Sequence, residues 1–397
     1  MMKKNHSLMI FLLFLGYVIV YIDKTVMGFA LIPIEKEFGV STQQLGYITG
    51  IFFLSYSLFQ IPAGWLNDRI GFRTMLLLSL CLLGGFALCF GLLGLSFGLL
   101  VMFRFLSGVG HSGYPCSCAK AVASNFSVEQ RTFAQSFLLS SAGLAMTIGP
   151  MVAVSALTHI GWRASFAGLG LLACAVAIVI FMLVQKPQVA VKTKTNASFR
   201  ALLKNPTVVL LFIAIFCINI PSYGLLAWLP KFLVQQRHMP LETSGLVIAA
   251  GGLGIWISSL GTGWLVGKYF QGREPRVIVI CSLISALCIF TIYHTASAMA
   301  ASVFLFFGEV FLMGSFVTVF TLPMKRLPVE TMGGAMGLIN TGGTLGGFVS
   351  PIVMGYLISN SHDYYSTFIF LALSMVCSAL AVLPLMTKKS ALNLVAE

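Results

Sequence analysis

Long apolar stretches recur along the whole chain, and short hydrophilic segments separate them. Each stretch has close to the roughly 20 residues that an α-helix needs to cross a bilayer. A helix satisfies all its backbone polar groups internally, so the pattern predicts membrane-spanning helices. We place twelve spans near residues 8–33, 44–66, 74–95, 97–124, 132–157, 164–185, 206–230, 244–267, 276–297, 299–323, 332–358 and 366–386.

The composition excludes a soluble globular protein. Of the 397 residues, 58% are hydrophobic and only 9% are charged, whereas soluble domains carry about 25% charged residues. The chain is therefore expected to be an integral membrane protein. Its first 30 residues are too long and too charged for a cleavable signal peptide, so the first span is expected to remain.

The basic residues set the orientation of the spans. The net charge is +13, but the basic residues are dispersed in short loops without aromatic interleaving, so no nucleic-acid partner is expected. With both termini inside, seventeen basic residues fall on the cytoplasmic side and four on the opposite side. The positive-inside rule thus predicts a multi-pass protein of the cell (inner or plasma) membrane with both termini cytoplasmic.

A basic segment at residues 186–206 divides the spans six plus six. We predict an all-α membrane protein of twelve transmembrane helices in two six-helix bundles, at residues 1–185 and 207–397, with 186–206 as a cytoplasmic linker. The halves also repeat each other: Gly64-Trp65-Leu66 recurs as Gly263-Trp264-Leu265, and Pro150 recurs as Pro351 at nearly the same offset. Such parallel repeats are typical of transporters.

The sequence motifs do not indicate an enzyme. The nine Cys residues lie in apolar segments without metal-ligand spacing, which indicates core residues, so no metal and no cofactor are expected. The chain has no phosphate-binding loop, HExxH or GxSxG motif. A membrane enzyme or a sensor is the weakest reading, because the hydrophilic segments are too short for a further domain.

The loop at residues 64–73 carries the most specific motif. It reads GWLNDRIGFR, with Gly64, Asp68, Arg69, Gly71 and Arg73 at fixed spacing. It resembles the GxLxDRxGRR signature of the major facilitator superfamily, with Phe at one basic position. The resemblance implies the twelve-helix major facilitator fold and a conformational latch in this loop. An amphipathic turn with an Asp-Arg pair is the alternative.

Further segments resemble the anion:cation symporters of that superfamily, which carry sugar acids and other organic anions with protons. Those segments are Tyr21-Ile22-Asp23-Lys24, Tyr56 with Gln60-Ile61-Pro62-Ala63-Gly64, Arg104 with Gly108, Gly161-Trp162-Arg163, Trp228-Leu229-Pro230-Lys231-Phe232, and Asn340. The chain departs from the family twice. Lys24 stands where the family usually has Arg, and His111 stands where it has a carboxylate.

Charged residues inside the predicted spans are the candidate functional groups. Each costs roughly 2.5–3.5 kcal/mol at bilayer depth, so it is rarely kept without a partner or a task. Asp23 and Arg104 fall at similar depth and are expected to meet. Arg104, His111 and Pro115 share one face of the fourth span. A static ion pair and a hydrogen-bonded core His are the structural alternatives.

Glu309 is the other acid well inside a span. Its charge could match Lys24, accept a proton or repel a wrong substrate, and helix packing is the alternative. The full set of candidates is substrate-binding Lys24, Arg104, Tyr21, Tyr56, Gln60, Asn340 and Tyr223, and proton-coupling Asp23, His111 and Glu309. The reference pKa of His, about 6.5, suits proton exchange near neutrality.

Two transport functions fit these residues. The leading hypothesis is proton-coupled uptake of a small organic anion by alternating access, with Lys24 and Arg104 attracting the carboxylate. The alternative is proton-coupled efflux of a drug or siderophore-like compound, which the 33 Phe residues leave open. The expected partners are a small anionic substrate, protons and the lipid bilayer, and a monomer is expected.

Overall fold

The structure is entirely helical over the residues that it describes. The computed structural model describes residues 2–184, 199–327 and 329–387. The helices are α1 (Met2–Phe38), α2 (Thr42–Ile70), α3 (Phe72–Leu93), α4 (Phe97–Asn125), α5 (Val128–His159), α6 (Gly161–Leu183), α7 (Phe199–Lys204), α8 (Pro206–Lys231), the π-helical turn η1 (Phe232–Gln236), α9 (Leu241–Tyr269), α10 (Glu274–His294), α11 (Ala298–Arg326), α12 (Val329–Ser361), α13 (Tyr365–Val382) and α14 (Pro384–Thr387).

Local sequence signals fix where these helices begin and end. Ser41 and Gln44 form a capping box at the start of α2, since each side chain bonds the backbone N–H of the other. Ser96 caps α4 in a similar way through the N–H of Leu99. Gly71 separates α2 from α3 at φ +81°, a conformation that favours glycine.

Eleven of the described helices are long and apolar enough to cross a membrane. The remaining long helix, α4, does not reach that standard of apolarity, because Arg104, His111 and several Ser and Gly residues interrupt it. It packs between α2 and α3, and it buries Arg104 and His111. The predicted span at 97–124 is thus a long helix with a polar face.

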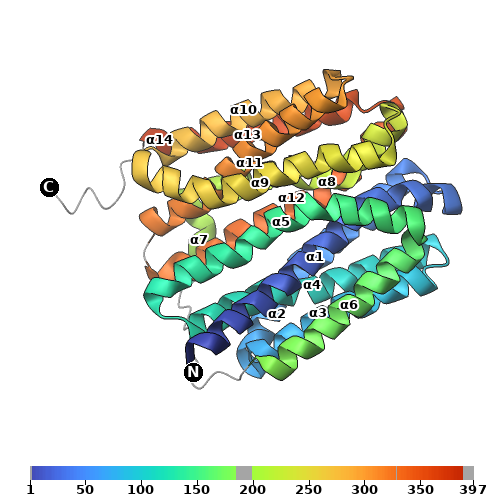
Figure 1. Ribbon diagram of the computed structural model, residues 1–397. Helices are drawn as coiled ribbons and strands as arrows, with labels where there is room; N and C mark the ends of the chain where they lie inside the picture. The colour runs from blue at the N-terminus through green and yellow to red at the C-terminus, as the bar shows by residue number, and fades with distance from the viewer. Residues whose placement is uncertain (1, 185–198, 328, 388–397) are drawn as a thin grey trace.

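The helices form two groups that follow the order of the chain. Helices α1 to α6 contact one another, and so do α8 to α13. The start of α1 and the short helix α14 lie at the same end of the molecule, which we call the terminal end (Figure 1). Helix α7 falls within the predicted linker at 186–206, and residues 186–198 of that linker lie outside the described ranges.

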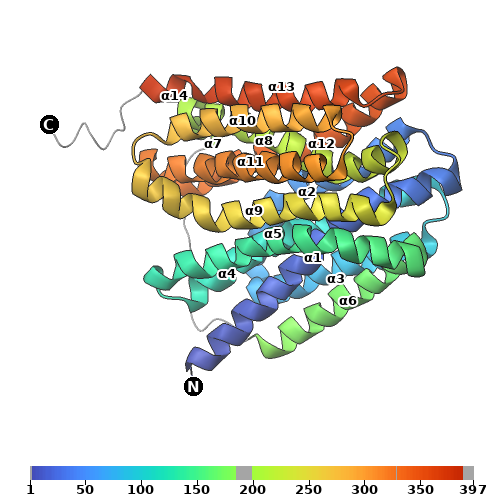
Figure 2. The same cartoon turned by 45° about the horizontal axis from the view of Figure 1, so that its top comes forward.

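Three helix pairs join the two groups: α1 with α8, α2 with α12, and α5 with α9. The axes of α5 and α9 diverge toward the terminal end (Figures 1 and 2). Near the middle of these helices an added Cβ at Gly252 of α9 would collide with the main chain of Met146 of α5. At the end opposite the terminal end, Glu35 of α1 and Lys231 of α8 form an ion pair between the groups. The groups therefore touch toward the opposite end, which we call the far end.

Candidate functional site

A buried ion pair connects the first and fourth helices. Arg104 Nη1 lies 3.0 Å from Asp23 Oδ2, and the two side chains are 3% and 0% exposed. The expected meeting of these residues is confirmed. Among the described residues, the other carboxylate oxygen, Asp23 Oδ1, has no hydrogen-bond partner, and neither has Arg104 Nε. The pair is thus incompletely satisfied, and loss of either partner would leave an uncompensated charge.

Lys24 occupies an aromatic enclosure instead of an ion pair. Its Nζ lies 4.8 Å from the ring centroid of Tyr21 and between 5.6 and 5.9 Å from four further rings, which belong to Phe52, Phe53, Tyr56 and Tyr223. Cation–π attraction stabilises the ammonium group without neutralising it. Lys24 is 5% exposed, and no carboxylate of the described residues pairs with it.

His111 lies beside the same aromatic groups. Its ring is 5.4 Å from that of Phe52 and 4.4 Å from that of Tyr56, centroid to centroid, and its Nδ1 has no hydrogen-bond partner. Arg104 and Lys24 also border the Phe52 ring. A proton on His111 would place a third positive charge around this ring. Like charges repel strongly at such depth, which makes His111 the least favourable proton acceptor of the group.

Neutral polar groups extend the site toward the terminal end. Asn340 on α12 lies close enough to the Tyr56 hydroxyl on α2 to interact with it, and the neighbouring Thr344 donates to the Ser57 hydroxyl at 3.0 Å, so polar contacts cross between the two helix groups. One turn further along α2, the Oε1 atom of Gln60 is buried without a partner. These groups, with the hydroxyls of Tyr21 and Tyr223, offer donors and acceptors around Lys24.

Glu309 lies apart from this cluster. It is 7% exposed, and it lines a cavity of about 30 Å³ together with Thr25 and Ser222. None of the described residues forms an ion pair with it, so the suggested match between Glu309 and Lys24 is not seen. The structure thus brings Tyr21, Asp23, Lys24, Tyr56, Tyr223, Arg104 and His111 together around Phe52, and it separates Glu309 from them.

The loop motif lies at the terminal end, between α2 and α3. Asp68 Oδ1 is 2.7 Å from Lys120 Nζ of α4, and Lys120 also donates to the carbonyl of Asn67 at 3.0 Å. The Arg69 guanidinium stacks on Trp65 at 3.5 Å, and Arg73 donates to the carbonyl of Phe181 at 2.6 Å. All these contacts stay within α1 to α6. In this conformation the motif therefore rigidifies one helix group.

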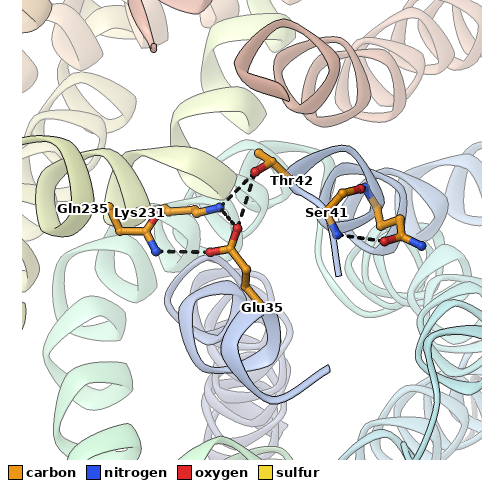
Figure 3. A network of polar contacts seen from close by, with 6 residues as sticks. Glu35, Ser41, Thr42, Lys231 and Gln235 are labelled. Carbon is orange, nitrogen blue, oxygen red and sulfur yellow. Dashed lines mark hydrogen bonds and ion pairs between the residues drawn. The ribbon is translucent and has the colours of Figure 1, made fainter. Parts of the chain in front are cut away.

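A second polar network joins the two groups at the far end (Figure 3). Lys231 Nζ, at the end of α8, lies 2.5 Å from Glu35 Oε1 near the end of α1. Gln235, in the π-helical turn η1, donates to the other oxygen of Glu35 at 3.2 Å. Thr42, at the start of α2, lies 3.4 Å from both Glu35 Oε1 and Lys231 Nζ. Both helix groups are thus tied together at this end.

Sequence reasoning missed both Lys120 and the Glu35–Lys231 pair. The signal for the second was available, because α1 and α8 open the two repeated halves and each carries a charge at its far end. Glu35 and Lys231 were therefore candidates for a contact between the halves. The partner of Asp68 gave no such signal, because Lys120 lies far away in sequence.

Comparisons with known proteins identify the family. A model of the Major Facilitator Superfamily matches residues 13–351, most of the chain. The chain belongs to this superfamily, so it is a membrane transporter and not an enzyme. A bacterial homologue of the human lysosomal transporter Spinster, solved in an inward-facing and occupied conformation, has a TM-score of 0.77 at 16% identity, with 96% of this chain and 95% of that chain covered.

Several curated relatives are transporters of acids. A probable galactarate/D-glucarate transporter of Bacillus subtilis is 27% identical, with 94% of this chain and 90% of the relative covered. A probable L-galactonate transporter of Escherichia coli is 24% identical (96% and 89% covered). A probable sulfoacetate transporter of Cupriavidus necator is 27% identical (98% and 96% covered). The resemblance to transporters of sugar acids and other organic anions is thereby confirmed.

Proposed function

We propose that this protein takes up a small organic anion, such as a sugar acid, together with protons. Lys24 carries the proposal. It is a buried cation that no carboxylate of the described chain neutralises, and it lies at the junction of α1, α2 and α8. A buried cation of this kind is stabilised when an anionic ligand binds beside it and neutralises its charge. The relatives named above, which are transporters of galactarate, galactonate and sulfoacetate, support a carboxylate or a similar acid.

The hydroxyl groups of a sugar acid would find partners next to its carboxylate. Tyr21, Tyr56 and Tyr223 offer hydroxyls together with ring faces, and Gln60 and Asn340 offer amides. Arg104 is engaged by Asp23, so it contributes to anion attraction when that pair opens. The substrate-binding set is therefore Lys24 as the principal charge, with the tyrosines and amides giving specificity.

Protonation of acidic side chains would favour binding of the anionic substrate through electrostatic attraction. Protonation of Asp23 would release Arg104 and raise the positive charge around Lys24 when an anion must bind. Glu309 would serve as the second exchanging group, or His111 once a bound anion offsets the charges of Lys24 and Arg104. Coupling of this kind is reciprocal, because a bound anion also favours the protonated state of a nearby acid.

Transport would proceed by alternating access in a twelve-span protein. α4 would be the twelfth span beside the eleven apolar ones. The spans would form two bundles, at residues 1–185 and 207–397, joined by the linker at 186–206. The terminal end would face the cytoplasm of a cell whose inner or plasma membrane holds the protein as a monomer. Contacts at the far end, with divergence at the terminal end, support an inward-facing state (Figure 2). Rocking of the halves would open the far end.

The loop at 64–73 would act as the latch of the opposite state. Asp68 is 61% exposed and bound only within its own half, so it is available to a partner that approaches when the terminal end closes. Gly64 has open space in the present state, which leaves room for that approach.

A substrate panel tests this function. The purified protein is reconstituted in liposomes loaded with an aldonate, a uronate, an aldarate or a sulfonate, and entry of the labelled acid by exchange is measured. We expect exchange of at least one acid above protein-free liposomes. Absence of exchange for every acid, with proton-driven movement of a drug, would establish the efflux function in its place.

A further inference from the structure

A small cavity lies where five helices from both halves meet. Its lining comes from α1, α5, α8, α9 and α11, and its volume is about 30 Å³. Most of the lining is apolar, with Leu225, Ile248 and Leu305 among the side chains. The polar side chains are those of Thr25, Ser222 and Glu309. The cavity therefore places three polar side chains within an otherwise apolar contact region between the two halves.

Glu309 is the unexplained group in this cavity. It is 93% buried, given its 7% exposure, and its Oε2 atom has no hydrogen-bond partner in the part of the chain that the structure describes. Gly251 of α9 packs against its Cγ, and Cys288 of α10 packs against the neighbouring Gly308. No Lys, Arg, His or acid appears among the cavity residues that α1, α5, α8 and α9 contribute. An ionised carboxylate in these surroundings is much less stable than the neutral acid.

The size and the donor set of the cavity select its ligand. A water molecule needs about 10–15 Å³ of such space and two to four polar partners, so the cavity has room for one or two. Hard metal cations take about six or more oxygen ligands, and three oxygen-bearing side chains fall short of that number. A proton needs one carboxylate oxygen and a neighbouring water.

Two helices of the proposed substrate site, α1 and α8, also line this cavity. Thr25 follows Lys24 directly on α1, and its hydroxyl donates to the carbonyl of Tyr21 at 3.1 Å, so its lone pairs can accept from water. On the other side, Gly252 of α9 abuts the main chain of Met146 of α5, which closes the junction between the halves. Binding of substrate at Lys24, or rotation of the two halves against each other, would therefore alter the surroundings of this cavity.

We propose that this cavity is the binding site of the coupling proton, which Glu309 holds as a neutral carboxylic acid hydrogen-bonded to a water between Thr25 and Ser222. The inference rests on the proposed proton-coupled uptake. A hydronium ion in the cavity transfers its proton to a carboxylate oxygen of Glu309: one O–H bond of the hydronium breaks, one O–H bond forms on the carboxyl group, and a neutral water remains. No ion pair has to open for this step. Glu309 would thus take up its proton while Asp23 is still bound to Arg104, before the protonation of Asp23 that releases Arg104. Outward opening at the α5–α9 junction would expose Glu309.

Transport by Glu309→Gln tests the proposal, with Glu242→Gln as the matched control, because Glu242 is an exposed acid in the first turn of α9. We expect Glu309→Gln to exchange labelled acid within about twofold of wild type, while accumulation driven by a pH gradient falls at least about tenfold. Equal gradient-driven accumulation by wild type and Glu309→Gln would overturn the proposal. Exchange without any gradient effect in wild type would defeat the proposed proton coupling itself.

A chemical measurement follows proton occupancy without transport. Dicyclohexylcarbodiimide modifies protonated carboxyl groups in apolar sites, so labelled peptides of the wild-type protein are quantified from acid to alkaline pH. We expect labelling at Glu309 that falls as pH rises, with Glu242 unlabelled as the internal control. Thr25→Val, which removes the proposed water partner but keeps the carboxyl group, should shift that fall along the pH axis. Absence of Glu309 labelling at every pH, or accumulation driven by sodium in place of protons, would overturn the assignment.

Discussion

Glu35 and Lys231 form an ion pair of 2.5 Å across the boundary between the two halves. The Lys231 side chain is 3% exposed and that of Glu35 is 26% exposed, so water screens the pair only in part. The pair, with Gln235 and Thr42, lies at the end where the halves touch (Figure 3). It has to separate whenever that end opens.

Neutralising this pair should shift the protein toward the state that is open at the far end. Removal of one favourable cross-half contact changes a two-state population by about tenfold for each 1.4 kcal/mol lost. We expect Glu35→Gln to increase the labelling of a cysteine introduced at the far end of α2. Glu37→Gln is the matched control, because Glu37 pairs with Arg163 at 2.7 Å within one half. Equal labelling of Glu35→Gln and Glu37→Gln would show that the Glu35–Lys231 pair does not stabilise the closed far end.

Lys24 should dominate the affinity for the anion. Truncation of one partner in a buried charge pair costs about 2–5 kcal/mol, so Lys24→Gln should weaken binding by at least about 30-fold. Lys24→Arg should keep most of the affinity, because it keeps the charge. Titration of the purified protein with the transported acid measures both. Lys36→Gln, at the exposed end of the same helix, is the control. Unchanged affinity in Lys24→Gln would place the anion elsewhere.

The Asp23–Arg104 pair should behave as one unit in stability. Loss of either charge leaves the other buried without its partner, which costs about 3–5 kcal/mol. We expect Asp23→Leu and Arg104→Leu each to lower the thermal unfolding temperature in detergent. The double variant should be more stable than the sum of the two changes indicates. Strict additivity of the two losses would mean that the 3.0 Å contact contributes little.

Asp68 should affect turnover but not binding. In the present state it contacts only Lys120 of its own half, so its proposed latch role applies to the opposite state. We therefore expect Asp68→Asn to slow transport while the affinity for the acid stays unchanged. Stopped-flow or filter-based rates, measured beside equilibrium titrations, separate the two effects. Normal turnover of Asp68→Asn would show that Asp68 does not act as a conformational latch.

Much of the fold follows from the sequence, because hydropathy over about 20 residues is a local property. Eleven of the twelve predicted spans correspond to described helices that are long and apolar enough to cross a membrane, and the predicted span at 97–124 corresponds to the more polar helix α4. The estimate of depth brought Asp23 and Arg104 together correctly. Rotation about the helix axes was harder to predict. Three consecutive residues of α1 face different surroundings: Asp23 faces Arg104, Lys24 faces the aromatic rings, and Thr25 faces the Glu309 cavity.

Contacts between the halves could not be predicted from local patterns. The pair of Glu35 and Lys231 depends on which end of the molecule is closed, and that is a property of the conformational state. The position of Glu309 away from Lys24 depends in the same way on how α11 packs against α9. The sequence places charges at the far ends of both α1 and α8, but it does not show whether those ends are in contact, and it does not show where Glu309 packs.

Uptake of labelled sugar acid into liposomes with an imposed pH gradient tests the central claim most directly. With the external side acidic, we expect the acid to accumulate above its external concentration and the accumulation to collapse when a protonophore is added. Liposomes without a gradient give the baseline. Entry that stops at equal concentrations and ignores the protonophore would contradict proton-coupled uptake.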